Sequence, residues 1–244
     1  MHQGQRDLWP AISSPSSLES IIGFHLDGSC NISAKVGNGM SRYVFCGSLH
    51  VRANNSQNLA KWQGVEPVSI PINGLFRAMK TLREVDETHS PKTFIKEWSP
   101  SFSPRGKDGL GPIVAVIDIS HETPVYDMNK LESGGVAYRK FPTVSKLPPT
   151  VDEVKSFIEI VDLLRRELGL DDAKEISQPF VAVHCHYGFN RTGFFIIAYL
   201  VEKLHWKLKD AIDEFAKARP PGVRHSHFVD ELYARYWTHD NDRS

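Results

Sequence analysis

The sequence predicts an α/β domain that follows a shorter, β-rich N-terminal extension. Two apolar runs, Ile113–Ile119 and Pro179–Val183, are typical of buried strands in an α/β sheet. The run Phe194–Val201 is apolar nearly all round, which is typical of a core helix. Short, turn-punctuated segments before residue 56 depart from this pattern and predict the extension.

Residues 1–105 are expected to form the extension and residues 106–240 the main domain. Within the extension, Ile21–His25 and Arg42–Arg52 are predicted to be strands, with glycine-containing turn dipeptides between them. No motif in this part indicates a chemical role or a partner.

Four more helices are predicted from apolar residues at helical spacing. They are Ile72–Val85, Thr150–Gly169, Lys207–Ala218 and His225–Trp237. The second begins at a capping box formed by Thr150 and Glu153. Its expected buried stripe consists of Val151, Val154, Ile158, Val161 and Leu164.

The stretch HCHYGFNRTG, His184–Gly193, joins the second buried strand to the core helix. A tight turn from a strand into a helix directs several backbone N–H groups at one point, where the helix dipole adds positive charge. Those donors belong to His186, Tyr187, Gly188, Phe189 and Asn190. Gly188 permits backbone angles that a Cβ atom would forbid. The stretch therefore predicts a phosphate-binding loop.

Each end of this loop carries a reactive or charged side chain. Arg191 offers a planar guanidinium that grips two phosphate oxygens, and the positive field lowers the pKa of the Cys185 thiol. Thr192 is placed to hydrogen-bond the sulfur, and His184 to fix the loop through backbone carbonyls. Cys185, five residues and Arg191-Thr192 form the signature of the cysteine phosphatase superfamily. A buried structural cysteine and a metal site at His184–His186 are the alternatives, and neither accounts for glycine, arginine and threonine at these offsets.

Further charged residues are expected at the same edge of the sheet. Asp118 ends the first buried strand and is the candidate general acid, with Asp127 as a second choice; as alternatives, Asp118 caps a turn and Asp127 is a solvated loop residue. Candidate cations that meet an anionic substrate are Lys140, Lys146, Arg219 and Arg224. The last two flank a rigid Pro-Pro-Gly turn.

The composition limits the possible partners and location. Lys and Arg together number 29, as do Asp and Glu, so no overall positive field indicates nucleic-acid binding, which would need a local patch. Three cysteines cannot all pair, and a thiolate needs reducing surroundings, so an intracellular location, nuclear or cytoplasmic, is expected. No apolar run is long enough to span a membrane, and neither a membrane partner, a metal nor a cofactor is expected.

Residues 111 to about 237 resemble the cysteine-phosphatase type of RNA 5′-triphosphatase found in animal mRNA capping enzymes and their free-standing relatives. The similarity rests on IDIS, VYDMNKLESGGVAYRKF, HCHYGFNRTGFFIIAYLVEKLHW and AIDEFAKARPPG. Asn190 and the ARPPG turn favour this branch. The resemblance implies the dual-specificity phosphatase fold, a mostly parallel central sheet with helices on both faces. It also implies that Cys185 is the nucleophile, Arg191 the phosphate clamp and Thr192 the partner of the leaving thiolate.

Two features depart from that family. The segment Pro142–Pro148 carries Lys146 as its one charge, where the animal enzymes have a basic loop containing Gly-His. No stretch of this sequence resembles their nucleotidyltransferase domain.

These observations predict a metal-independent phosphatase that forms a phosphocysteine intermediate. The expected substrate is the terminal phosphate of 5′-triphosphate RNA or a related phosphoanhydride, because a diphosphate leaves without a proton and no Trp-Pro-Asp loop supplies an acid. One alternative is a tyrosine or dual-specificity phosphatase that acts on phosphoproteins. Another is a non-catalytic phosphate-binding module whose N-terminal half docks a partner.

Overall fold

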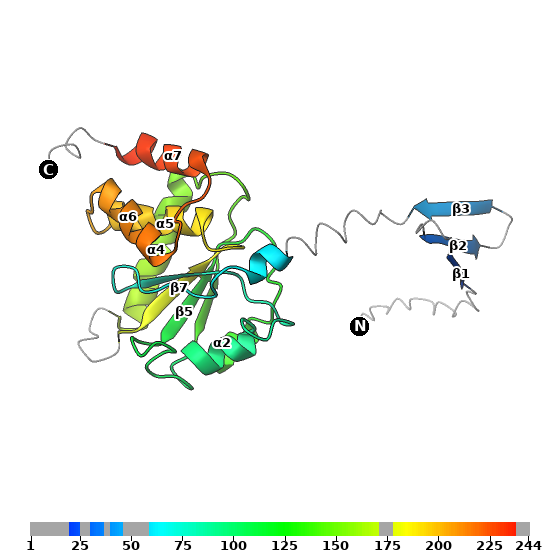
Figure 1. Ribbon diagram of the computed structural model, residues 1–244, viewed down its shortest axis with the longest axis horizontal. Helices are drawn as coiled ribbons and strands as arrows, with labels where there is room; N and C mark the ends of the chain where they lie inside the picture. The colour runs from blue at the N-terminus through cyan, green and yellow to red at the C-terminus, as the bar shows by residue number, and fades with distance from the viewer. Residues whose placement is uncertain (1–19, 25–29, 37–39, 46–58, 171–177, 238–244) are drawn as a thin grey trace, which may run out of the picture. The chain divides into compact units, whose positions relative to one another are not determined.

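The computed structural model describes residues 20–24, 30–36, 40–45, 59–170 and 178–237 of the chain (Figure 1). It divides into two units, Met1–Ala60 and Lys61–Ser244. The first unit contains an antiparallel sheet of strands β1 (Ser20–Phe24), β2 (Cys30–Val36) and β3 (Met40–Phe45), in that order. A β-rich extension is therefore present, although the expected turn dipeptides and the end of the expected strand at 46–52 lie outside the described residues.

The second unit is built on a four-stranded sheet in the order β4-β7-β5-β6. Its strands are β4 (Phe76–Met79), β5 (Ile113–Asp118), β6 (Ala137–Lys140) and β7 (Phe180–His184). Every neighbouring pair is parallel, so all four strands end at one edge. The sheet confirms the α/β class and the two buried strands that the sequence predicts.

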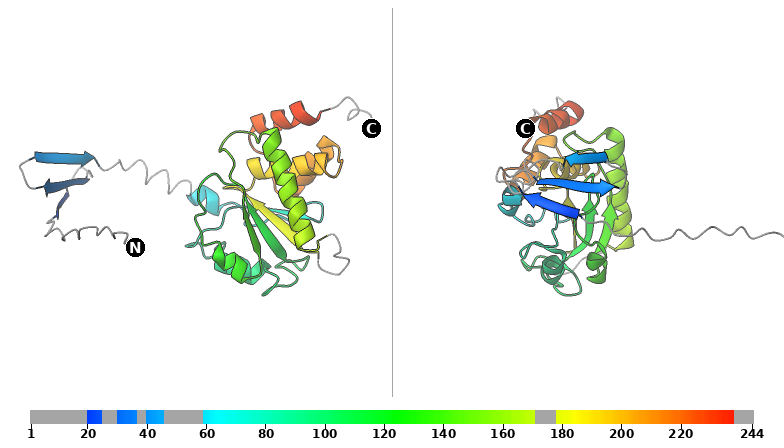
Figure 2. Two further views of the ribbon diagram at one scale, coloured as in Figure 1. Left: turned by 180° about the vertical axis from the view of Figure 1, so that it is seen from behind. Right: turned by 90° about the vertical axis from the view of Figure 1, so that its right-hand side faces the viewer.

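Helices cover both faces of this sheet (Figure 2). One face carries α2 (Pro91–Trp98) and α3 (Asn129–Ser133), and the other carries α4 (Val151–Glu167), α5 (Asn190–Glu202), α6 (Leu208–Ala218) and α7 (Ser226–Tyr236). Alternate strand residues serve the two layers, as the two-residue strand period requires. Val181 and Val183 pack in the cluster of α4 to α7, whereas Phe180 and Ala182 pack with α2 and α3.

The predicted helices after residue 150 are present within a few residues of their expected ends. Thr150 caps α4, and its capping box with Glu153 is formed in both directions. The expected stripe is wrong at Val151, which is half-exposed because it lies in the first turn, and Phe157 takes its place in the core. In α5, ten consecutive residues from Arg191 to Leu200 are buried, which is the signature of a central core helix.

The helix expected over Ile72–Val85 is wrong. Asn73 and Gly74 both have positive φ, at 48° and 65°, and form a turn between Ile72 and Phe76. An Asn-Gly pair with positive φ is a hairpin turn, so the next residues enter β4 rather than a helix. The boundary expected at residue 105 is also misplaced, because β4 pairs with β7 inside the main sheet.

Four residues, one from the end of each strand, lie in a row at the carboxyl edge of the sheet. Met79 of β4 pairs with His184 of β7, His184 pairs with Asp118 of β5, and Asp118 pairs with Lys140 of β6. The phosphate-binding loop predicted from the sequence, Cys185–Arg191, follows His184 directly and leads into α5. Among the described helices, none combines the length and apolar character needed to cross a membrane.

Candidate active site

The loop Cys185–Arg191, called the phosphate loop below, is held tightly against the end of β4. Gly188 has a φ of 73°, and a Cβ atom at this position would lie 2.2 Å from the carbonyl oxygen of Met79. No side chain fits at that distance, so glycine is required for both backbone angle and space. The N–H of Thr81 donates to the carbonyl of His186 at 3.1 Å and fixes the other side of the loop.

The phosphate loop keeps backbone donors available for a ligand. None of the hydrogen bonds between described residues uses the N–H of His186, Tyr187, Phe189 or Asn190 as its donor. Helix α5 begins at Asn190, and its N-cap residue, Phe189, has no side-chain oxygen to satisfy the first turn. An uncapped helix N-terminus and free loop amides form an anion-binding site.

Cys185 lies buried at the base of this loop. Burial alone would raise the pKa of its thiol, but several groups outweigh that effect and lower it. These groups are the charge of Arg191, the Thr192 hydroxyl and the N–H groups of Gly188 and Thr192. The Thr192 hydroxyl is buried and otherwise without a partner among the described residues. The surroundings therefore stabilise a thiolate, the nucleophilic form of cysteine.

Arg191 is oriented by one edge of its guanidinium. Its Nη1 donates to the carbonyl oxygens of Ile119 and Thr143 at 3.1 and 3.0 Å. No hydrogen bond between described residues uses Nε or Nη2 of Arg191. Neither atom is among the buried polar atoms that lack a partner, so both are accessible. This arrangement leaves a rigid edge for two oxygens of a phosphoryl group.

His184 binds the backbone of the phosphate loop, the type of contact expected from the sequence. Its Nδ1 lies 2.9 Å from the carbonyl oxygen of Cys185, and its Nε2 lies 2.8 Å from the hydroxyl of Tyr126. Burial lowers the pKa of His184, so the ring is neutral. The carbonyl only accepts, so Nδ1 carries the proton and Nε2 accepts from the Tyr126 hydroxyl. Tyr126 thereby fixes the tautomer that anchors the loop.

Asp118 does not fit the role of general acid expected from the sequence. Its side chain is fully buried and accepts from the N–H and hydroxyl of Ser120 at 2.9 and 2.5 Å, and from the hydroxyl of Tyr138 at 2.8 Å. Burial alone would raise its pKa, but the hydrogen bonds from Ser120 and the charge of Lys140 hold the pKa below its usual range. A buried carboxylate that is already ionised has no proton to donate.

Lys140 is also a structural residue rather than a substrate contact. Its Nζ donates to the carbonyl and the hydroxyl oxygens of Ser120 and to the carbonyl of Glu122, and lies 3.1 Å from Asp118. These partners use all three protons of the ammonium group. Lys146, in contrast, has an exposed side chain, while its carbonyl oxygen lies 3.1 Å from Nε2 of His227 at the start of α7.

The two arginines of the turn between α6 and α7 have different environments. Arg219 is buried and donates to the carbonyls of Glu66 and Tyr187 at 2.7 and 2.9 Å, so it braces the phosphate loop from outside. Burial lowers its pKa to about 10, an effect that the charge of Cys185 opposes. The structure thus gives Arg219 a role in supporting the loop, and the substrate contact expected from the sequence stays a prediction. Arg224 is exposed, and its guanidinium carbon lies 3.6 Å from the ring centre of Phe189.

Asn190 links this turn to the phosphate loop. Its side-chain oxygen accepts from the N–H groups of Arg224 and His225 at 2.8 and 3.0 Å. The side chain of Asn190 is thus a clamp for the turn, while its own N–H belongs to the first turn of α5. These hydrogen bonds tie the turn after α6 to the phosphate loop, and Arg224 is an exposed cation of that turn.

Several residues around the loop are not among those that sequence reasoning selected. Tyr126 and Glu66 lie far from the motif in sequence and act through a hydroxyl and a backbone carbonyl. Arg83 follows β4 and lies near enough to act on His186. Burial lowers the pKa of His186 most, the charge of Arg83 lowers it further, and the charge of Glu122 opposes both effects. A strand assignment for residues 76–79 would have placed Arg83 at the carboxyl edge of the sheet.

Comparison with known proteins gives three informative relatives. An mRNA-capping enzyme from Danio rerio is 31% identical over 180 residues, covering 72% of this chain and 28% of the relative. One from Mus musculus is 36% identical over 123 residues, covering 50% of this chain and 19% of the relative. A putative tyrosine-protein phosphatase 1 from Orgyia pseudotsugata multicapsid polyhedrosis virus is 32% identical over 121 residues, covering 50% of this chain and 51% of the relative. The chain spans between about a fifth and about half of the length of these curated relatives.

The pattern of one protein family covers more than half of the chain. The family described as "Dual specificity phosphatase, catalytic domain" matches residues 110–237, which contain the phosphate loop and α3 to α7. The 180-residue match to the Danio rerio protein is longer than this segment and includes residues before 110, beyond the similarity recognised from the sequence. The chain therefore belongs to the dual specificity phosphatase family and is a phosphatase of the cysteine type.

Proposed function

We propose that this phosphatase removes the terminal phosphate from 5′-triphosphate-ended RNA through a phosphocysteine intermediate. The Cys185 thiolate attacks the γ-phosphorus in line, a sulfur–phosphorus bond forms, and the bond to the β-phosphate oxygen breaks. Arg191 and the loop amides hold the equatorial oxygens while charge redistributes among them. Water then attacks the phosphocysteine, phosphate leaves with the proton released to solvent, and the thiolate is restored with support from the Thr192 hydroxyl.

The state of Asp118 is the observation that carries the choice of substrate class. A tyrosine or serine alkoxide is a poor leaving group that needs a proton from an acid, whereas a diphosphate leaves unprotonated at neutral pH. Asp118 is ionised and fully engaged, so it supplies no such proton. The similarity to proteins named mRNA-capping enzyme supports the same substrate class.

A phosphoprotein substrate is the second candidate, because the viral relative is named as a tyrosine-protein phosphatase. This reading requires another acid at the loop. Two exposed carboxylates are to be tested. The charge of Glu122 acts on His186, and Asp127, the second choice from the sequence, accepts through Oδ1 from the N–H of Asn129 at 3.0 Å.

Side-by-side turnover separates the two candidates. The enzyme, in reducing buffer with EDTA, is given triphosphate-ended RNA or a phosphotyrosine peptide at equal concentration, and phosphate release is measured. We expect kcat/KM for RNA to exceed that for the peptide by about a hundredfold or more, the size of a general-acid contribution. A preference for the peptide that is lost in Glu122→Gln or in Asp127→Asn would instead establish the phosphoprotein reaction.

An intracellular compartment, nuclear or cytoplasmic, belongs to the same proposal. The nucleophile works only as a free thiolate, and oxidising compartments convert low-pKa thiols to disulfides or sulfenic acid. Inactivation by hydrogen peroxide that dithiothreitol reverses would support this placement.

A further inference from the structure

A groove of about 470 Å³ adjoins the phosphate loop. One wall consists of residues between Gly64 and Ile70, and the other of residues between Lys217 and Arg224, with Phe189 contributed by the phosphate loop. All of them belong to the second unit of the chain. The groove therefore borders the phosphate loop at Phe189, and Cys185 is not among the residues that line it.

The walls of this groove are fixed rather than loose. Arg219 joins them to the loop, because its two terminal nitrogens donate to the carbonyls of Glu66 and Tyr187. The first wall is also tied to β4, since Ser69 N–H donates to the carbonyl of Ala78 at 2.8 Å and Lys80 N–H to that of Pro67 at 3.1 Å. A groove braced in this way is preformed for a ligand.

The exposed side chains of the groove combine cations with apolar surface. The guanidinium carbon of Arg224 lies 3.6 Å from the ring centre of Phe189, and the residue is exposed to solvent. Lys217 is exposed, and Ile70 keeps 52% of its surface accessible. With buried Arg219, the groove holds three cations against one carboxylate, Glu66.

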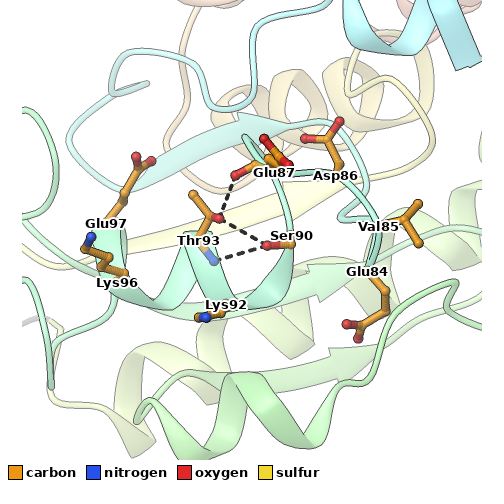
Figure 3. Close-up of a pocket in the computed structure, with 9 residues that line it drawn as sticks. All are labelled: Glu84, Val85, Asp86, Glu87, Ser90, Lys92, Thr93, Lys96 and Glu97. Atoms are coloured by element: carbon orange, nitrogen blue, oxygen red, sulfur yellow. Dashed lines mark hydrogen bonds between the residues drawn. The ribbon is translucent and has the colours of Figure 1, made fainter.

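A second cavity of about 520 Å³ shows the opposite charge pattern (Figure 3). It lies at the start of α2, where Ser90 and Thr93 form hydrogen bonds to each other and Thr93 to the carbonyl of Glu87. Four carboxylates and two lysines line it: Glu84, Asp86, Glu87, Glu97, Lys92 and Lys96. An anionic polymer is repelled there, so charge directs it to the groove beside the phosphate loop.

We infer that this groove binds the first nucleosides of a single-stranded RNA whose 5′ phosphates occupy the phosphate loop. A guanidinium plane held by an aromatic ring is a stacking platform for a base, and Lys217 is placed to neutralise a backbone phosphate. Ile70 supplies apolar contact on the facing wall. This inference rests on the proposed RNA substrate and specifies where the chain beyond the triphosphate lies.

Equilibrium binding tests the groove separately from the chemistry. Fluorescence anisotropy is measured with 3′-labelled single-stranded RNA carrying either a 5′-triphosphate or a 5′-hydroxyl, on the full chain with Cys185→Ser to prevent turnover. Lys217→Glu and Ile70→Glu are each expected to raise Kd about tenfold for both RNAs. Arg224→Lys, which keeps the charge but removes the planar face, is expected to raise Kd severalfold.

Two matched controls make the same chemical changes elsewhere. Lys209→Glu alters an exposed lysine on the same helix, α6, and Leu163→Glu alters an exposed leucine on α4. Both are expected to leave Kd within about twofold, as surface changes away from a site do.

The outcomes are distinct. The inference would be overturned if the groove variants bound RNA as tightly as the parent, or if the control variants weakened RNA binding as much as the groove variants. It would also be overturned if the groove variants lost phosphotyrosine-peptide binding as much as RNA binding. If the parent enzyme releases no phosphate from RNA, the proposed reaction fails. The binding measurement still decides whether the groove holds RNA.

Discussion

Two pairs of opposite charges lie at the same edge of the sheet, and they differ in how completely they are satisfied. Asp118 and Lys140 face each other across β5 and β6, and the hydrogen bonds from Ser120 and Tyr138 fill the remaining positions. Cys185 and Arg191 lie one strand away, where one edge of the guanidinium and several loop amides have no acceptor among the described residues. We call Asp118 and Lys140 the closed pair, because their hydrogen-bonding positions are filled. We call Cys185 and Arg191 the open pair, because donors beside them are free for a ligand.

The difference separates structural from chemical roles better than charge does. A buried ion pair with every lone pair and proton engaged has nothing left for a ligand, and its removal chiefly costs stability. A thiolate beside unpaired donors needs an anion to complete its surroundings. We therefore propose that the open pair is the reaction centre and that the closed pair holds the strand ends beside it.

Cys185→Ser is expected to have the largest effect. Serine lacks a nucleophilic anion at neutral pH, so kcat should fall by about 10⁴-fold or more on any substrate, with an unchanged circular dichroism spectrum. Ser133→Ala, on α3, is a control that should retain activity. Residual turnover above a few per cent would show that the open pair is not the reaction centre.

Arg191→Lys should lower kcat/KM by about 10²- to 10³-fold, because a lysine keeps the charge but loses the planar fork. The comparison is Lys140→Met in the closed pair, for which we expect a loss of activity of about tenfold at most, together with a lower melting temperature. Steady-state kinetics and thermal unfolding of both variants give the answer. Equal kinetic losses would contradict the distinction.

Thr192→Val removes the hydroxyl that stabilises the Cys185 thiolate. One hydrogen bond to a charged group contributes about 1.5–3 kcal/mol, so breakdown of the phosphocysteine should slow by about 10- to 100-fold. The same change should raise the thiol pKa, because a stabiliser of the anion is lost. The fall in kcat/KM on the acid side would then begin at a higher pH, and a pH–rate profile that does not move would count against this role.

Asp118→Asn should have the smallest kinetic effect, about tenfold at most, because no proton is taken from this group. The pKa of Asp118 is depressed in the folded state, so its contribution to stability is present above the unfolded pKa of about 3.9 and is lost as pH falls through the folded value. Urea unfolding should show a loss of about 1–3 kcal/mol at neutral pH. A fall in kcat of a hundredfold or more, with disappearance of a basic limb in the pH profile, would restore Asp118 as the general acid.

The phosphate loop was predictable because its chemistry is local in sequence. Cys185, Gly188, Arg191 and Thr192 lie within eight positions, and a strand and a helix flank them in any arrangement of the remaining chain. The same holds for the capping box of α4, which depends on residues three apart.

The rest depended on pairing between distant strands. Lys140 and Asp118 both looked reactive from sequence because the register that makes them neighbours is not visible there. The apolar residues in 72–85 have a spacing that fits a helix. In the structure the Asn73-Gly74 turn and the pairing of the following residues with β7 make this segment a strand. With that strand missed, the wall at Glu66 and the cation at Arg83 had no position relative to the loop.

Rapid-quench transfer of label would show directly whether Cys185 carries a phosphoryl group during turnover. The enzyme is mixed with RNA carrying a ³²P label in its γ-phosphate and quenched within the first turnover, and the protein is digested and sequenced by mass spectrometry. We expect a transient phosphoryl group on the peptide that contains Cys185, formed at least as fast as phosphate is released. Phosphate released at the steady rate with no labelled protein at any time would contradict it.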